Sequence, residues 1–294
     1  MAKRHWLLST TSITALVVGL PVAALAADLS SPAPAYNPYA TPASLPAVSA
    51  INGKIGTFAG DVSNNFAVGA YGSLAVPLSQ QWGAQIDGMF GTAGGAFYGV
   101  GGHVFWRDPS QGLIGAYASY VGWGASGTIP VGAPIGGVAD FTGANVGKIG
   151  IEGEAYLGRV SLEGLAAYQY GTNSGLAGKA TVAYYPSDDL RLDLSLRYLQ
   201  GVGGIGSASV EWAPTESGFT LFADAAVGGN SNWQVLGGAK WYFGGKEKSL
   251  IRRHREDDPE NSLPLDLYET TGSGHCPPGT DLTDGTPAAC TPPG

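Results

Sequence analysis

The most constraining feature of this 294-residue chain is a regular alternation of apolar and polar residues between about Ile51 and Phe243. The clearest stretch runs from Leu190 to Tyr198, where even positions are apolar and odd positions, such as Arg191, are polar. A period of two is typical of β-strands with two different faces, whereas amphipathic helices repeat about every 3.6 residues. The chain also contains 47 glycines, which are unfavourable inside helices. We therefore predict an all-β fold.

The alternating region divides into twelve predicted strands separated by short segments rich in turn residues. Most of these strands have the roughly 9–11 residues that a tilted strand needs to cross a membrane. Their number is even, as in single-chain bacterial outer-membrane barrels. The expected fold is a transmembrane, antiparallel, up-and-down β-barrel of about twelve strands. The predicted strands cover residues 51–59, 66–76, 82–91, 96–106, 113–121, 146–157, 160–170, 176–185, 190–199, 205–212, 219–227 and 233–243.

Alternation alone also fits a soluble, lipocalin-like barrel, so the chemistry of the two faces decides between them. Only 13% of the residues are charged, against about 25% in a usual soluble domain. The apolar face of the predicted strands is nearly free of charge, as a surface in contact with lipid must be. Scattered surface aromatics on a soluble β protein are the alternative to a membrane barrel. The aromatics instead predict two belts at the strand ends, with Trp82, Trp106, Tyr184, Trp212, Phe219, Trp241 and Phe243 at the periplasmic rim and Phe66, Phe90, Tyr98, Trp123, Tyr170, Tyr198 and Trp233 at the outer rim.

The first 47 residues predict export and a spacer. Lys3, Arg4 and His5 precede a short apolar segment, and Ala24-Leu25-Ala26 has the form of a cleavage site. Residues 1–26 are therefore predicted to be a secretory signal peptide, with a single uncleaved anchor helix as the alternative. Residues 27–47 are rich in Ala and Pro, a composition that favours an extended periplasmic spacer. The barrel itself is predicted over residues 48–243.

Residues 244–294 differ in character from the barrel. A block of Lys and Arg is followed by Glu and Asp, and then by many Pro, Gly and Thr residues. This composition predicts a largely disordered periplasmic tail, whose basic block either is solvated or contacts anionic lipid or peptidoglycan. The only two cysteines, Cys276 and Cys290, fall in this tail, and in an oxidising compartment they are expected to form a disulfide.

The segment Trp233–Phe243 resembles the closing strand of outer-membrane barrels, although 51 residues follow it here. With the signal peptide and the Pro/Ala spacer, residues 1–243 resemble outer-membrane β-barrel and porin-like proteins of the alphaproteobacterial, rhizobial type. The resemblance implies a bacterial outer-membrane location, both termini in the periplasm, contact with lipid and lipopolysaccharide, and recognition by the outer-membrane assembly machinery. Mature barrels of that group that begin with Ala-Asp can be joined to peptidoglycan, which would make Ala27 an attachment site. An ordinary processed terminus is the alternative.

The charged face of the strands predicts the residues that line the lumen. Acidic residues on strands 146–157 and 160–170 and basic residues on 176–185 and 190–199 would form two arcs. Facing arcs would create a transverse field in a pore, whereas pairing across neighbouring strands would close the lumen. Both outcomes are open, as is inward folding of the long loop 122–145. The predicted lining residues are Lys54, Asp87, His103, Lys148, Glu152, Glu154, Glu163, Lys179, Arg191, Asp193, Arg197, Glu211, Asp224 and Lys240.

The function expected from these features is a porin-like outer-membrane channel for passive diffusion of small hydrophilic solutes. A structural barrel that tethers the membrane to peptidoglycan is the alternative, and an outer-membrane enzyme is a more distant one. His103 lies on the inward phase of its strand, where a hydrogen-bond network is expected rather than catalysis. The sequence offers no catalytic, cofactor or metal constellation, and the net charge of −8 gives no reason to expect a nucleic-acid partner.

Overall fold

The computed structural model describes residues 45–62, 65–124, 144–171, 174–199, 203–228, 233–244, 248–257, 259–264, 281–282 and 290–291. The predicted signal peptide, most of the spacer, Ala27 and Cys276 lie outside these residues. The same holds for most of the predicted long loop, positions 125–143. The predictions made for these parts of the chain therefore stay predictions.

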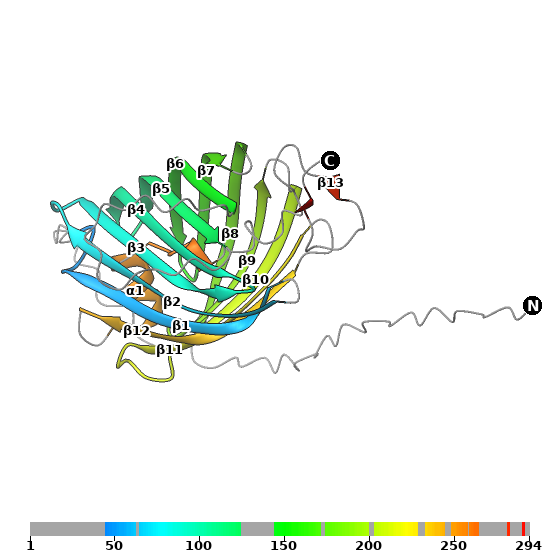
Figure 1. Ribbon diagram of the computed structural model, residues 1–294. Helices are drawn as coiled ribbons and strands as arrows, with labels where there is room; N and C mark the ends of the chain where they lie inside the picture. The colour runs from blue at the N-terminus through cyan, green and yellow to red at the C-terminus, as the bar shows by residue number, and fades with distance from the viewer. Residues whose placement is uncertain are drawn as a thin grey trace, which may run out of the picture. The chain divides into compact units, whose positions relative to one another are not determined.

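Twelve antiparallel strands form a closed barrel (Figure 1). Each strand pairs with its neighbours in chain order, and the last strand closes the barrel by pairing with the first. The predicted fold class is confirmed, and the predicted strand ends differ from the observed ones by at most three residues, as at the end of the first strand. The strands are β1 (Asn52–Val62), β2 (Asn65–Pro77), β3 (Trp82–Ala93), β4 (Ala96–Asp108), β5 (Gly112–Gly124), β6 (Ala144–Leu157), β7 (Val160–Gly171), β8 (Gly175–Ser187), β9 (Leu190–Leu199), β10 (Gly203–Trp212), β11 (Phe219–Gly228) and β12 (Trp233–Phe243).

The barrel has two rims, which we name by their position in the chain. The terminal rim is where β1 begins and β12 ends, and it carries the turns that follow even-numbered strands. The distal rim carries the turns that follow odd-numbered strands. Some terminal-rim turns are very tight: Gly158 and Arg159 alone join β6 to β7. Gly158 has φ of 60°, a conformation that favours glycine.

The apolar face of the strands points out of the barrel and the polar face points in. On β9, Leu194 and Leu196 are 69% and 72% exposed, whereas Arg191 and Arg197 are buried. Because successive side chains of a strand point to opposite faces, this arrangement follows directly from the alternation in the sequence. Among the described residues, no helix is long and apolar enough to cross a membrane.

The predicted aromatic belts are found in part. Trp82 and Trp241 are exposed on the outer face at the terminal rim, and Phe66 and Phe90 are exposed toward the distal rim. The prediction for Trp123 is wrong. This side chain is partly buried and packs against a cluster inside the barrel, because the inward phase of β5 falls on odd positions.

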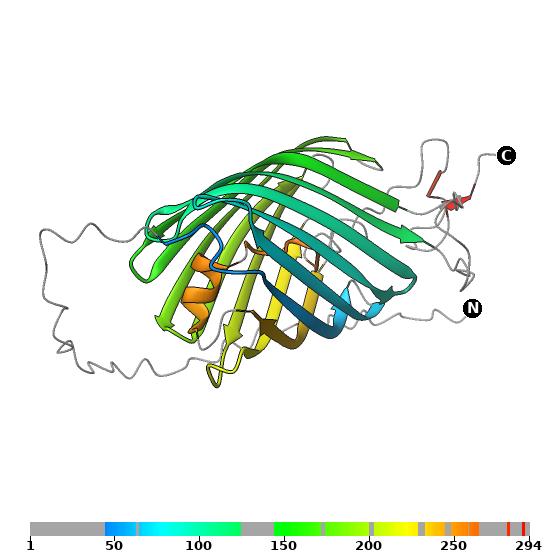
Figure 2. The same ribbon diagram turned by 90° about the vertical axis from the view of Figure 1, so that its left-hand side faces the viewer.

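The chain after β12 returns into the barrel. We call residues 248–257 and 259–264 the lumenal segment. It contains the helix α1 (Leu250–Glu256), which lies within the barrel in Figure 2. Leu250 and Leu263 are fully buried. For these residues the predicted disordered tail is wrong, because their polar groups are bonded to the inner wall and their apolar groups are packed against it. Farther along the chain, β13 (Asp281–Leu282) and β14 (Cys290–Thr291) pair with each other.

Gly244 makes the change of direction after β12 possible. Its φ is 76°, and a Cβ atom at this position would collide with the Ile51 carbonyl oxygen. Glycine avoids both the steric clash and the backbone strain. The segment that follows can therefore leave the sheet directly after the closing strand.

Candidate functional site: the occupied lumen

The structure places all fourteen predicted lining residues on the inner face of the barrel. Eight of them are buried, and the other six are partly buried with their contacts inside the lumen. Arg107 also lies on this face and was missed by the sequence analysis. It is fully buried and stacks over Phe105 at 4.7 Å from the ring centroid. Arg107 lies four positions after His103 on the same strand and therefore shares its inward face, which is the signal that could have identified it.

The predicted acidic and basic arcs meet in direct ion pairs. Arg191 on β9 contacts Glu163 on β7 at 2.8 Å and Asp193 at 2.7 Å. Elsewhere, Lys240 on β12 contacts Glu211 on β10 at 2.6 Å. Charges buried at this depth require such partners, since an unpaired charge there would cost several kcal/mol. These pairs join next-but-one strands, β7 with β9 and β10 with β12, rather than the neighbouring strands of the pairing alternative.

His103 forms a hydrogen-bond network, as expected. Its Nε2 lies 2.8 Å from Asp87 Oδ2, and its Nδ1 lies 2.9 Å from the Glu152 carboxylate. These contacts connect β3, β4 and β6 across the inner wall. Because both ring nitrogens face carboxylates, neither is directed at a hydroxyl nucleophile in this arrangement. Among the described residues, no group of His, Cys, Asp or Glu side chains is arranged to hold a metal ion.

Polar contacts attach the lumenal segment to the inner wall. The Pro259 carbonyl oxygen accepts hydrogen bonds from Lys54 Nζ at 3.1 Å and Gln85 Nε2 at 3.2 Å. Asn261 donates to Ser73 Oγ at 3.2 Å. These bonds join the segment to β1, β2 and β3.

An ion pair between Lys179 and Glu260 attaches the same segment to β8 on the opposite side of the lumen. Glu260 therefore brings a carboxylate to the basic part of the wall.

His254 on α1 is enclosed by side chains from several strands. Its Nδ1 lies 2.9 Å from the Tyr185 hydroxyl, and its Nε2 lies 3.1 Å from the Tyr242 hydroxyl. The Arg191 guanidinium is also close, with its Nη1 3.3 Å from His254 Nδ1. A proton on His254 would therefore place a second positive charge beside this cation.

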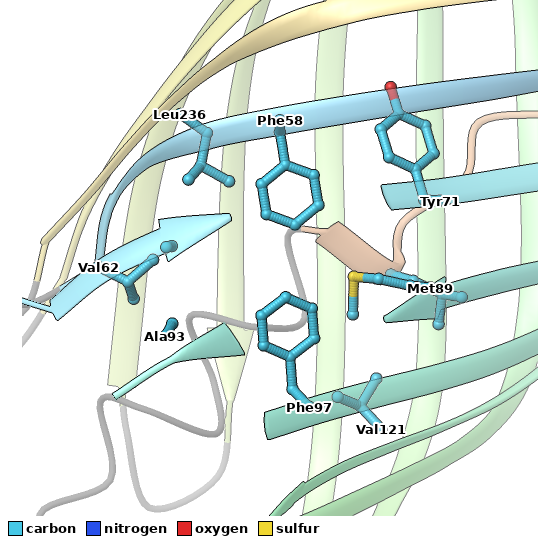
Figure 3. Close-up of a cluster of buried hydrophobic side chains, with 10 residues drawn as sticks. Phe58, Val62, Tyr71, Met89, Ala93, Phe97, Val121 and Leu236 are labelled. Carbon is cyan, nitrogen blue, oxygen red and sulfur yellow. The ribbon is translucent and has the colours of Figure 1, made fainter. Parts of the chain in front are cut away.

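An apolar cluster inside the barrel holds the far end of the segment (Figure 3). Leu263 is fully buried in this cluster, which also contains Phe58, Met89, Phe97 and Val121. The Phe58 and Phe97 rings are stacked with centroids 6.1 Å apart. This apolar patch of the inner wall accommodates a leucine of the lumenal segment.

The residues that precede β1 in the sequence and those that follow β12 meet at the terminal rim. Asp257 Oδ1 accepts hydrogen bonds from Ser49 Oγ at 2.6 Å, Asn52 Nδ2 at 3.0 Å and Lys248 Nζ at 2.6 Å. Val48 is buried against Phe105 and other inner-wall side chains. Residues 45–50 and α1 together therefore cover this mouth of the barrel.

A cavity of about 90 Å³ lies between the lumenal segment and the walls formed mainly by β6–β12. It is bordered by charged wall residues such as Glu163, Arg191 and Lys240. Within the described part of the chain, the lumenal segment therefore occupies the lumen and leaves this cavity beside it.

These observations define a closed antiparallel barrel with an apolar outer face and a charged lumen that is occupied by the chain's own C-terminal segment. No protein-family profile and no curated protein sequence matches the chain. Among solved structures, it is similar to the KdgM porin in complex with disordered oligogalacturonate (9% identity, TM-score 0.47, covering 65% of this chain and 99% of that one).

It is also similar to the outer membrane phospholipase A from Escherichia coli (14% identity, TM-score 0.45, 65% and 92% covered). A third match is an outer membrane channel from Pseudomonas putida F1 (11% identity, TM-score 0.44, 69% and 99% covered). At these identities and TM-scores, none of the matches carries information on the function of this chain.

Proposed function

We propose that this protein spans a bacterial outer membrane and acts as a channel for small hydrophilic solutes, which its own lumenal segment closes. The outer face supports the membrane location, because large apolar side chains such as Leu194, Leu196 and Ile151 are more than 60% exposed there. A surface of this kind is unfavourable in water and matches lipid tails. The lateral hydrogen bonds of the closed barrel satisfy the strand backbones within the membrane.

The observation that supports a gated channel is the polar attachment of the lumenal segment to the wall. Apart from its apolar anchors, the segment is joined to the wall by ion pairs and hydrogen bonds, such as those of Glu260 and Asn261. When it leaves, water can hydrate both the wall and the segment. A barrel meant only to be filled would be sealed more stably by apolar packing.

Single-channel recording in planar bilayers tests this proposal with the refolded full chain. Wild-type protein is expected to be closed most of the time. Glu260→Lys places a cation beside Lys179, and at an effective dielectric constant of ~20 the repulsion at ~4 Å amounts to about 4 kcal/mol. This variant is expected to show discrete open states far more often. Glu216→Lys, on an exposed turn, introduces the same charge change and is expected to behave like wild type.

A reversible crosslink provides the complementary test. Ser73→Cys combined with Asn261→Cys, in a chain with Cys276→Ser and Cys290→Ser, joins two positions whose side chains are hydrogen-bonded. Oxidation is expected to abolish the openings and reduction to restore them. Absence of channel steps from correctly folded Glu260→Lys protein would refute the channel proposal.

The occupied lumen favours a second candidate, a permanently closed barrel that tethers the membrane to peptidoglycan through Ala27. Muropeptide analysis separates this function from the first. Barrel protein recovered covalently on purified peptidoglycan, together with the absence of channel steps, would support it. Loss of that recovery in a variant whose mature terminus is changed would assign the attachment to Ala27. The partners predicted from the sequence, lipopolysaccharide and the assembly machinery, remain predictions in both cases.

A further inference from the structure

The lumenal segment has a definite direction inside the barrel. It begins at the terminal rim, where Ile251 N donates to the Asp188 carbonyl oxygen at 3.0 Å and Leu250 N donates to Asp189 Oδ1 at 3.2 Å. Asp188 and Asp189 lie at the turn between β8 and β9, which belongs to this rim. The helix α1 therefore lies at the mouth through which the segment enters.

The segment then advances toward the distal rim. Pro259 contacts Gln85, which lies close to the terminal end of β3. Leu263 reaches Gly99, where a Cβ atom would lie 3.5 Å from Leu263 Cδ2. Gly99 pairs with Met89, so the segment has advanced by four residues along β3, from position 85 to position 89. At ~3.3 Å per residue this corresponds to about 13 Å along the strand, which an extended chain of four residues can just cover.

The chain continues for 30 residues beyond Pro264, to position 294. A return to the terminal rim would require a second passage of polypeptide beside the lumenal segment, which already contacts β1, β2 and β3 on one side of the lumen and β8 on the other. The distal mouth is the shorter exit, since β4 begins at Ala96, only three residues from Gly99.

We infer that the chain is threaded through its own barrel, so that its N-terminal and C-terminal segments lie on opposite sides of the membrane. This inference rests on the proposed membrane-spanning function, and with the terminal rim in the periplasm, as the sequence predicts, it presents residues 265–294 at the cell surface. This placement differs from the sequence-based prediction that both termini lie in the periplasm. It also makes the segment containing Cys276 and Cys290 a surface available to extracellular partners.

The two natural cysteines allow a test in the full chain, because no other cysteine is present. Intact cells are treated with a membrane-impermeant reductant and then with a membrane-impermeant maleimide. Two control variants, built in a chain without the natural cysteines, report the two rims: Ser110→Cys for the terminal rim and Ser174→Cys for the distal rim. Both serines are exposed and lie at turns of the barrel.

The natural cysteines are expected to be labelled in intact cells together with Ser174→Cys, whereas Ser110→Cys is labelled only after the outer membrane is permeabilised. Labelling of the natural cysteines only together with Ser110→Cys would overturn the inference. If Ser110→Cys is labelled in intact cells and Ser174→Cys only after permeabilisation, the barrel is inserted in the opposite sense. In that case, labelling of the natural cysteines under the same condition as Ser174→Cys still supports threading.

Equal labelling of both controls in intact cells would instead argue against the proposed membrane-spanning function. The chain can be threaded through its barrel whether or not the barrel spans a membrane, so this outcome leaves threading to a second measurement. Energy transfer in purified protein decides threading in that case. Cys290, with Cys276→Ser, is labelled together with either Ser174→Cys or Ser110→Cys. Stronger transfer to position 174 supports threading, and stronger transfer to position 110 contradicts it.

Discussion

Replacing Leu263 by alanine tests how firmly the lumenal segment is held. Leu263 is fully buried in the apolar cluster with Phe58, Phe97 and Val121. Leucine-to-alanine changes in protein cores cost about 2–5 kcal/mol, depending on how well the site can collapse. Here the surrounding side chains belong to strands fixed by barrel hydrogen bonds, so little collapse is expected. We therefore expect docking of the segment to weaken by about 3 kcal/mol.

Trypsin cleavage measures this change, because the lumenal segment carries Arg252, Arg253 and Arg255. When closing is fast relative to cleavage, the cleavage rate follows the population of the undocked state. At about 1.4 kcal/mol per factor of ten, a loss of about 3 kcal/mol raises the population of that state about 100-fold. Cleavage of Leu263→Ala in the refolded protein should accelerate by about that factor.

The matched control is Leu194→Ala, which removes the same atoms from an outward-facing position that is 69% exposed. Its cleavage rate is expected to remain near that of wild type. The barrel of each variant is checked by its heat-modifiable migration in gels. An unchanged cleavage rate for Leu263→Ala in an intact barrel would refute the view that this leucine holds the segment in the lumen.

Two further predictions concern charged groups. His103→Ala leaves Asp87 and Glu152 without their shared partner, so urea unfolding should show a loss of about 3–5 kcal/mol, whereas a loss below about 1 kcal/mol would contradict the described network. Docking should also weaken as the pH falls below about 6.5, the ordinary pKa of histidine. A proton on His254 would place a positive charge 3.3 Å from the Arg191 guanidinium in the docked state, whereas the undocked histidine is free to accept it. The fraction of open channels should then rise at low pH, and His254→Gln should reduce that dependence; an identical pH response in the variant would exclude His254 as its source.

The barrel could be predicted from the sequence because its signal is local. Alternation in β9 determines that Leu194 points out of the barrel and Arg191 points in, and that pattern needs no knowledge of the neighbouring strands. The inward position of His103 followed from the same rule. Trp123 was misplaced because its position at a strand end was considered without its phase.

The lumenal segment could not be predicted because its signal is not local. Glu260 and Asn261 belong to a polar stretch that by composition resembles a solvated tail. Their partners, such as Lys179 and Ser73, precede them by 81 and 188 residues. In the sequence, the charged face of the strands and the charged tail are each compatible with hydration by water. Only the closed barrel shows that they form ion pairs and hydrogen bonds with each other. The isolated leucines at 250 and 263 were the one available signal.

Asp257 is relevant to both candidate functions, because its carboxylate accepts hydrogen bonds from the residues at the start of the barrel and from Lys248 of the lumenal segment. Ser49 and Asn52 bind it from one side and Lys248 from the other. If Ala27 is attached to peptidoglycan, a load on the spacer reaches Ala47, which is bonded to Gln80 and Arg107, and then acts on this junction. Asp257→Asn removes the charge from the buried Lys248 contact, so we expect more frequent channel openings but unchanged recovery of the protein on peptidoglycan. Openings as rare as in wild type would mean that the junction does not keep the lumenal segment in place.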